Sequence, residues 1–337
     1  MTILISISHL KKKHLFTLLK ILVSGGLISW LLVKIGINRI VVEIASANLW
    51  WICASVGAFM LSNILGSYQW YLLLRNKNLP LSFTQVLSFY HVGLFFNNFL
   101  IGYVGGDAFR IYDVTKATND STNAISTVFF DRFIGFFTLS FLAMVVSLFW
   151  LQNVGSLAII FTILIIMMGF VVSLLFLFKQ RLAKQASRLL GRLLPTVINS
   201  KLRELYFELN QFRHSKKFLL NLFLIALVVQ ILRVITHVLA ARSVGVETNI
   251  LHFFVFIPII AMAASLPISF GGIGVREQSG VTLFAQIGVA SNLVVIFEFI
   301  AYLVGIFASI PGGIIFIMRK GEAKSELTKV RETVRSS

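Results

Sequence analysis

The chain alternates long apolar runs with short polar connections. Eight runs carry few charged residues, over about 15–37, 49–74, 84–104, 124–151, 156–178, 218–241, 251–269 and 290–318. A helix needs roughly 20 predominantly apolar residues to cross a bilayer, and most of the runs reach that length. They lack the apolar–polar alternation of membrane β-barrel strands. The pattern predicts an all-α polytopic membrane protein, with residues 1–337 forming a single integral membrane domain.

Two Gly-Gly turns inside the apolar sequence belong to a weak internal repeat. The segment LIGYVGGDAFR (100–110) is echoed by LPISFGGIGVR (266–276), and a mixed polar and apolar stretch follows each turn. Interrupted hydrophobic segments at matching positions of a repeat point to the binding site of a transporter. We therefore predict two repeats, over about 49–151 and 218–318, each containing one re-entrant or broken helical hairpin.

The basic residues predict how the chain is oriented. The loop 179–217 holds ten lysines and arginines, and both the N-terminal segment and the tail 319–337 are also basic. Such segments favour the cytoplasmic side of a membrane. We therefore expect a multi-pass protein of the cytoplasmic membrane with both termini in the cytoplasm.

The number of crossings between these basic segments then fixes the relation of the two repeats. If 84–122 and 251–289 each return to the side that they enter from, all three basic segments lie in the cytoplasm. The run 49–74 then enters from outside and the run 218–241 from inside. Parity and charge together predict an inverted-topology repeat with two hairpins.

Composition narrows the classes of function. The chain is 57% hydrophobic and only 13% charged, and its formal net charge is +17. Because the basic residues lie in loops between apolar runs, the charge is explained by topology and anionic headgroups, and we expect no nucleic-acid partner. The run 15–37 is too long for a signal-peptide core and is expected to be a retained first helix. Cys53 is the only cysteine, and no metal or catalytic motif is present, so no cofactor is expected.

The Gly-Gly turns supply the first candidate binding residues. A helix that begins at such a turn presents free N–H groups and a positive dipole end to an anion. Arg110 and Arg276 follow about one turn later and could clamp a phosphate through two parallel hydrogen bonds. Asp107 and Glu277 could cap these helices or orient the arginines. The alternative is that the glycines allow tight packing and the arginines reach headgroups. The glycines concerned are Gly105, Gly106, Gly271 and Gly272.

Further charges lie deep in the apolar runs. Arg132 and Glu298 occupy matching positions of the repeat with opposite sign, which suggests a direct ion pair, either functional or purely structural. Arg233 lies near the middle of 218–241 and shares one helix face with Gln230 and His237, so this face should look into the bundle. Intramembrane charges are expensive and usually functional.

Three blocks around these residues resemble a known family. The runs NNFLIGYVGGDAFRIYDV (97–114), FFDRFIGFF (129–137) and SLPISFGGIGVRE (265–277) are similar to the signature blocks of the flippase-like integral membrane family. That family includes the N-terminal flippase domain of lysylphosphatidylglycerol synthase/flippase proteins. The resemblance implies a stand-alone lipid-handling membrane domain. By this resemblance, the motif residues of the family correspond in this chain to Asp107, Arg110, Arg132, Arg276 and Glu277.

These observations favour a transporter over an enzyme. The leading expectation is a lipid flippase that moves an anionic phospholipid or lipid-linked headgroup between leaflets. One alternative is a membrane transferase acting on polyprenyl-phosphate or phospholipid substrates. Another is a non-catalytic scaffold of an envelope-biosynthesis complex. The expected partner is an anionic membrane lipid, with a homo-oligomer or envelope-biosynthesis enzymes as further possibilities.

Overall fold

The computed structural model describes most of the chain after the first predicted helix. The described residues are 42, 45–99, 104–149, 157–178, 206–208, 210–212, 215–266, 269 and 272–336. Within them every regular element is helical and no strand occurs. The all-α prediction is thereby confirmed for this part of the protein. The run 15–37 and most of the basic loop 179–217 lie outside it.

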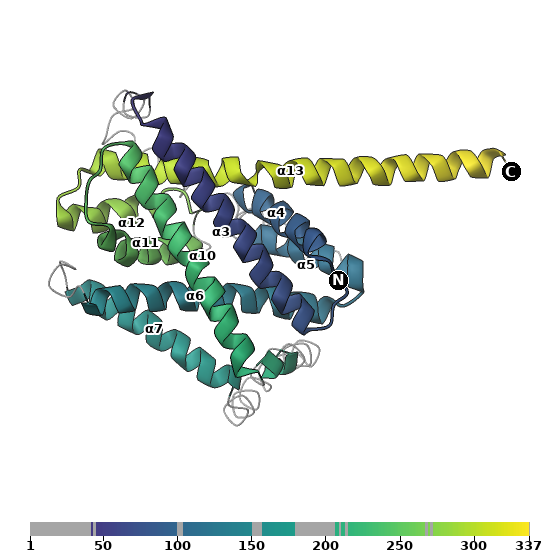
Figure 1. Cartoon of the computed structure of the whole chain (residues 1–337), viewed down its shortest axis with the longest axis horizontal. Coiled ribbons are helices and arrows are strands. Elements are labelled where there is room, and N and C mark those ends of the chain that lie inside the picture. Colours follow the sequence, from purple (N-terminus) through teal and green to yellow (C-terminus); the bar gives the residue numbers. More distant parts are fainter. Residues whose placement is uncertain are drawn as a thin grey trace, which may run out of the picture.

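The helices follow the apolar runs closely (Figure 1). In chain order they are α3 (Leu49–Asn76), α4 (Phe83–Phe99), α5 (Val104–Thr118), α6 (Ser121–Phe149), α7 (Leu157–Phe178), α10 (Lys216–Ser243), α11 (Ile250–Ser265), α12 (Val275–Phe284), a 3-10 turn (Ala285–Ile287) and α13 (Ser291–Ser336). Among the described residues, four helices are long and apolar enough to cross a membrane, namely α3, α6, α10 and the first part of α13. The chain is therefore a membrane protein built from several apolar helices.

Polar residues set the starts of three of these helices. The side chains of Asn48, Ser215 and Asn249 accept hydrogen bonds from the first turns of α3, α10 and α11. Each satisfies one of the backbone N–H groups that an N-terminus leaves without an intrahelical partner. The starts of these helices can therefore be recognised from the local sequence.

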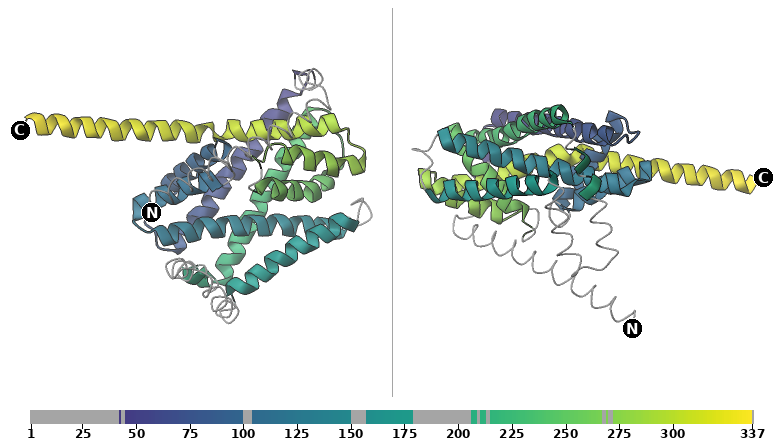
Figure 2. Two further views of the ribbon diagram at one scale, coloured as in Figure 1. Left: turned by 180° about the vertical axis from the view of Figure 1, so that it is seen from behind. Right: turned by 90° about the horizontal axis from the view of Figure 1, so that it is seen from below.

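The long helices α3 and α10 pack against each other and run in opposite directions. At one end the backbone N–H of Asn48 donates to the carbonyl of Ser243 at 2.7 Å. At the other end Lys77 Nζ lies 2.6 Å from a carboxylate oxygen of Glu208. Figure 2 shows the two helices together on one face of the molecule.

Two shorter helix pairs lie between α6 and α13. Helix α4 packs on α5 and α13, whereas α11 packs on α12 and α6. In Figure 1, α4 and α5 lie toward the side from which α13 projects, and α11 and α12 lie toward the opposite side. These four helices have 17, 15, 16 and 10 residues. Each is shorter than the roughly 20 residues that a full crossing requires.

The two Gly-Gly pairs lie at or just before the starts of α5 and α12, as the sequence predicted, but at different positions relative to the helix. Helix α5 already begins at Val104, so Gly105 and Gly106 lie inside its first turn. Helix α12 begins at Val275, and Gly272 lies in the preceding turn with a φ of +78°. Gly271 lies outside the described residues.

Close helix packing explains why glycine is needed at the start of α5. A Cβ added to Gly106 would lie 1.9 Å from the backbone oxygen of Gly93 on α4. The glycine therefore brings the two arms of the hairpin into backbone contact. This is the packing role that the sequence left open as an alternative.

Candidate functional site

A cavity of about 240 Å³ lies at the centre of the helix bundle. Of the helices described above, all except α7 contribute to its wall. Its polar lining consists of Gln69, Tyr90, Asn97, Asn98, Arg110, Asp131, Arg132, Gln230, Arg233, His237, Ser265, Arg276, Tyr302 and Ser309. Such a concentration of arginine among apolar helices marks a candidate functional site.

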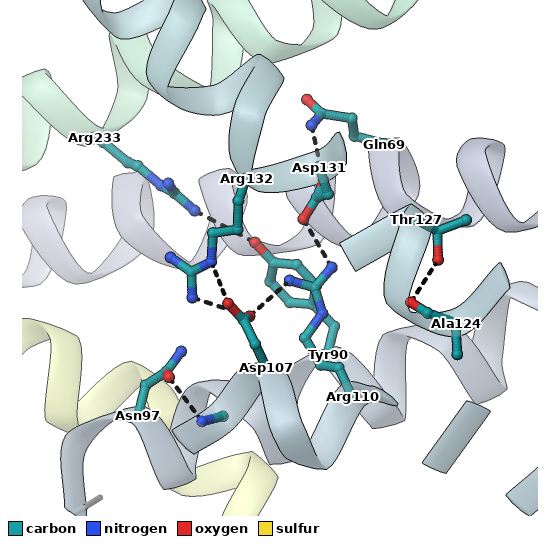
Figure 3. A network of polar contacts seen from close by, with 11 residues as sticks. Gln69, Tyr90, Asn97, Asp107, Arg110, Ala124, Thr127, Asp131, Arg132 and Arg233 are labelled. Carbon is teal, nitrogen blue, oxygen red and sulfur yellow. Dashed lines mark hydrogen bonds and ion pairs between the residues drawn. The ribbon is translucent and has the colours of Figure 1, made fainter. Parts of the chain in front are cut away.

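Asp107 on α5 links two of the cavity arginines (Figure 3). One carboxylate oxygen accepts from Nε of Arg132 at 2.7 Å, and the other accepts from an outer guanidinium nitrogen of Arg132 at 3.0 Å. Arg110 lies 3.4 Å from the second oxygen. The fork of Arg132 is therefore engaged by a carboxylate in the bidentate geometry that arginine favours. The carboxylate of Asp107 thus binds arginine.

Arg110 is held from several sides. One guanidinium nitrogen donates to Asp131 at 2.7 Å, and Asp131 also accepts from the amide of Gln69 at 2.9 Å. The guanidinium lies 4.1 Å from the ring centre of Trp70 and 4.7 Å from that of Tyr90. The side chain is buried. These contacts compensate its charge within the protein and fix it in place.

Arg233 on α10 differs from these two arginines. One of its nitrogens donates to the hydroxyl of Tyr90 at 3.3 Å, and its Nε, like that of Arg110, is buried without a hydrogen-bond partner among the described residues. No carboxylate of the described chain lies within 4.0 Å of it. Its Cα lies ten residues before Ser243, roughly 15 Å from the nearer helix end. This cation is therefore both deep and not neutralised by a described carboxylate.

The second hairpin brings Arg276 and Glu277 to the same region. Arg276 lines the cavity and lies 5.5 Å from the ring centre of Tyr302. Glu277 accepts a hydrogen bond of 2.6 Å from the backbone N–H of Gly274, so it caps α12. This is one of the two roles predicted for Glu277.

Glu298 has a partner that the sequence did not predict. Its side chain is fully buried, and one oxygen lies 3.2 Å from Nδ1 of His237. Arg132 binds Asp107 instead. The structure thus gives Arg132 and Glu298 different partners, and the pair suggested by the repeat is replaced by two others. The reason is that Asp107 has no acidic counterpart in the second repeat, where Ile273 stands.

The stripe on α10 behaves as predicted. Gln230, Arg233 and His237 all line the cavity, so this face looks into the bundle. The sequence analysis missed Gln69, Tyr90, Tyr302 and Ser309. Gln69 alone carried a signal, because an amide inside an apolar run needs a partner.

A bundle of apolar helices around a charged central cavity defines a polytopic membrane protein with an internal polar site. The chain belongs to the family described as "Lysylphosphatidylglycerol synthase TM region", whose sequence pattern matches residues 17–313. It is similar to the "UPF0104 membrane protein PH1989" of Pyrococcus horikoshii, with 22% identity over 335 residues. The alignment covers 92% of this chain and 98% of that protein. The family membership predicted from the three sequence blocks is thereby confirmed.

Proposed function

We propose that this protein moves an anionic phospholipid or lipid-linked headgroup between the leaflets of the membrane. Arg233 is the observation that carries the proposal. An arginine at this depth costs about 2.5–3.5 kcal/mol on insertion scales unless it is compensated. The described chain offers it a tyrosine hydroxyl and no carboxylate. A lipid phosphate in the cavity would supply the missing charge and accept parallel hydrogen bonds from the guanidinium.

The arrangement of helices supports an inverted-repeat carrier as the route across the membrane. Exchanging α3, α4, α5 and α6 for α10, α11, α12 and α13 converts each extensive contact among these eight helices into another observed one; the packing of α7 on α6 has no counterpart. For example, α4 on α13 becomes α11 on α6, and α5 on α6 becomes α12 on α13. The antiparallel packing of α3 and α10 fits halves of opposite topology. In this proposal the two short helix pairs are re-entrant hairpins that enter from opposite sides, as in carriers that alternate access to a central site.

The carboxylates that a transferase would need are engaged in local contacts. Asp113 lies 3.0 Å from Arg319, and Asp120 accepts from the backbone and side-chain amides of Asn123. Asp107 binds Arg132. Within the described part of the chain, no group of three His, Cys, Asp or Glu side chains is placed to hold a metal. We therefore favour transport over the transferase alternative.

The test is translocation of labelled lipids in proteoliposomes. Phosphatidylglycerol and phosphatidylcholine, each labelled on an acyl chain, are followed by quenching of the outer-leaflet label. We expect the protein to equilibrate phosphatidylglycerol at least tenfold faster than phosphatidylcholine. Polyprenyl phosphate in a parallel arm asks whether the phosphate itself or the glycerol lipid is recognised. Rates equal to protein-free vesicles for both anionic lipids would refute the proposal.

A matched pair of arginine variants on α10 then tests the site. Arg233→Ala should slow phosphatidylglycerol movement at least tenfold because it removes the cation that meets the phosphate. Arg242→Ala is the control, because Arg242 lies at the end of the same helix in a loose, exposed pair with Glu247. Equal rates of phosphatidylglycerol movement in both variants would show that Arg233 does not bind the lipid.

A further inference from the structure

His237 and Glu298 form an acid–base pair in the cavity wall. Nδ1 of His237 on α10 lies 3.2 Å from Oε1 of Glu298 on α13. His237 lines the cavity, whereas Glu298 is fully buried behind it. The second carboxylate oxygen of Glu298 is buried without a hydrogen-bond partner among the described residues. The pair therefore places a titratable carboxylate one side chain away from the proposed lipid site.

No arginine or lysine of the described chain lies within 4.0 Å of Glu298. With a neutral histidine, the ionised carboxylate would be an uncompensated charge inside the membrane. The pair is electrically neutral when it holds one additional proton, shared between the imidazole and the carboxylate. Its protonation therefore belongs to the two groups together.

The groups around the pair decide how an anion affects this proton. Arg233 lies one helical turn before His237 on the same face of α10. Its positive charge lies beside the pair, and an anion bound in the cavity would neutralise it. Helices α3 and α11 add no charged side chain to the cavity lining. The other titratable or charged groups near the cavity are Asp107 and Arg110 on α5, Asp131 and Arg132 on α6, Arg276 and Glu277 on α12, Tyr90 and His91 on α4, and Tyr302 on α13.

We propose that His237 and Glu298 form a proton-binding site that is filled together with the anionic headgroup, so that the protein couples lipid movement to proton movement. The proposal rests on the lipid-transport function proposed above. Without the additional proton, Glu298 repels an anion beside His237 and Arg233. With it, the repulsion is gone, and the low dielectric of the site makes this difference large. Linkage is reciprocal, so the anion favours the proton as much as the proton favours the anion.

The charge balance determines whether lipid and proton move in the same or in opposite directions. The proton comes from water on one side, is held by the pair, and returns to water on the other side. One proton carried with a singly charged headgroup is electroneutral. Lipid and proton move in the same direction, so the lipid accumulates in the leaflet that faces the more alkaline side.

The experiment imposes a pH gradient on proteoliposomes that contain acyl-labelled phosphatidylglycerol. The membrane potential is clamped at zero with potassium and valinomycin. With the lumen one pH unit more alkaline, we expect the label to accumulate in the inner leaflet, up to about tenfold at one proton per lipid. Reversing the gradient should reverse the accumulation.

Two variants separate coupling from folding. Glu298→Gln keeps the size of the side chain but cannot ionise, so the distribution of phosphatidylglycerol between the leaflets should no longer follow the pH gradient. His237→Gln should also lose gradient-driven accumulation. Glu247→Gln is the control, since that carboxylate is exposed at the end of α10, and it should follow the gradient as the wild type does. Thermal unfolding in detergent checks that all variants are folded.

The possible failures are distinguishable. If wild-type protein equilibrates phosphatidylglycerol faster than empty vesicles but ignores the gradient, proton coupling is wrong and lipid transport stands. Gradient-driven accumulation that persists in folded Glu298→Gln overturns the assignment to this pair. If the protein equilibrates no anionic lipid at all, both proposals fall.

Discussion

At the scale of single residues, the cavity arginines divide by what compensates them. Arg110 and Arg132 bind Asp131 and Asp107, whereas no described carboxylate lies near Arg233. The sequence analysis placed all of them among its candidate binding residues because charges in apolar helices stand out. The sequence could not show which of these arginines are paired with a carboxylate, because the partners come from different helices and only packing brings them together.

Asp107 should contribute to stability because it contacts both Arg132 and Arg110. Removing one partner of a fully buried ion pair costs about 3–5 kcal/mol, and the pair of Asp107 with Arg132 is partly buried, so that range is its upper limit. We expect Asp107→Ala to lower the thermal midpoint strongly in detergent, with Asp107→Asn intermediate, and the double variant Asp107→Ala/Arg132→Ala to lose less than the sum of the single changes. Glu247→Ala, in an exposed pair, serves as the control. Strict additivity would show that the pair contributes no coupling energy.

At the scale of elements, the sequence located the helices but not the tips of the hairpins. Predicted runs such as 124–151 and 218–241 match α6 and α10 within three residues. The runs 84–104 and 251–269 overshoot, because α4 stops at Phe99 and α11 at Ser265. Both tips remain apolar in sequence, so hydrophobicity alone does not mark where the helix ends.

The contact between α4 and α5 leads to a prediction for Gly106. An added Cβ would meet the backbone oxygen of Gly93, which cannot rotate away, so the two helices must separate. Gly106→Ala should therefore destabilise the protein by about 1–3 kcal/mol or more. Gly57→Ala on α3 is the matched control, since nothing lies within 4 Å of its added Cβ, and it should be neutral or slightly stabilising. Equal midpoints for the two variants would contradict the tight crossing.

At the scale of the whole molecule, the orientation in the membrane follows from the positions of the loops. Lysines and arginines cluster in 179–217, at the start of α10, whereas the connection 244–249 between α10 and α11 carries no lysine or arginine and one acid, Glu247. The positive-inside preference then predicts that α10 begins in the cytoplasm. The antiparallel packing of α3 with α10 places the starts of the two helices at opposite ends, so α3 is then predicted to begin outside.

Single-cysteine labelling in a Cys53→Ala background tests this orientation. A membrane-impermeant maleimide should label Glu247→Cys in intact cells and Lys217→Cys only after lysis, since both native side chains are exposed at opposite ends of α10. Cys53 is itself exposed, so its removal is needed for a clean background. Labelling of Lys217→Cys from outside would refute the proposed topology.

The contact of Arg319 with the first hairpin has a consequence for the resting population of the protein. Arg319 on α13 lies 3.0 Å from Asp113 on α5 and also donates to Ser88 on α4, so one side chain holds both arms. In the second hairpin the position that matches Asp113 is Ser279, which cannot form the same ion pair. Two otherwise interchangeable halves thus differ in how firmly they are held. If the two halves exchange conformations during transport, the protein has one state open to each side of the membrane. The difference between the hairpins then makes these two states unequally populated, and one of them predominates between transport cycles.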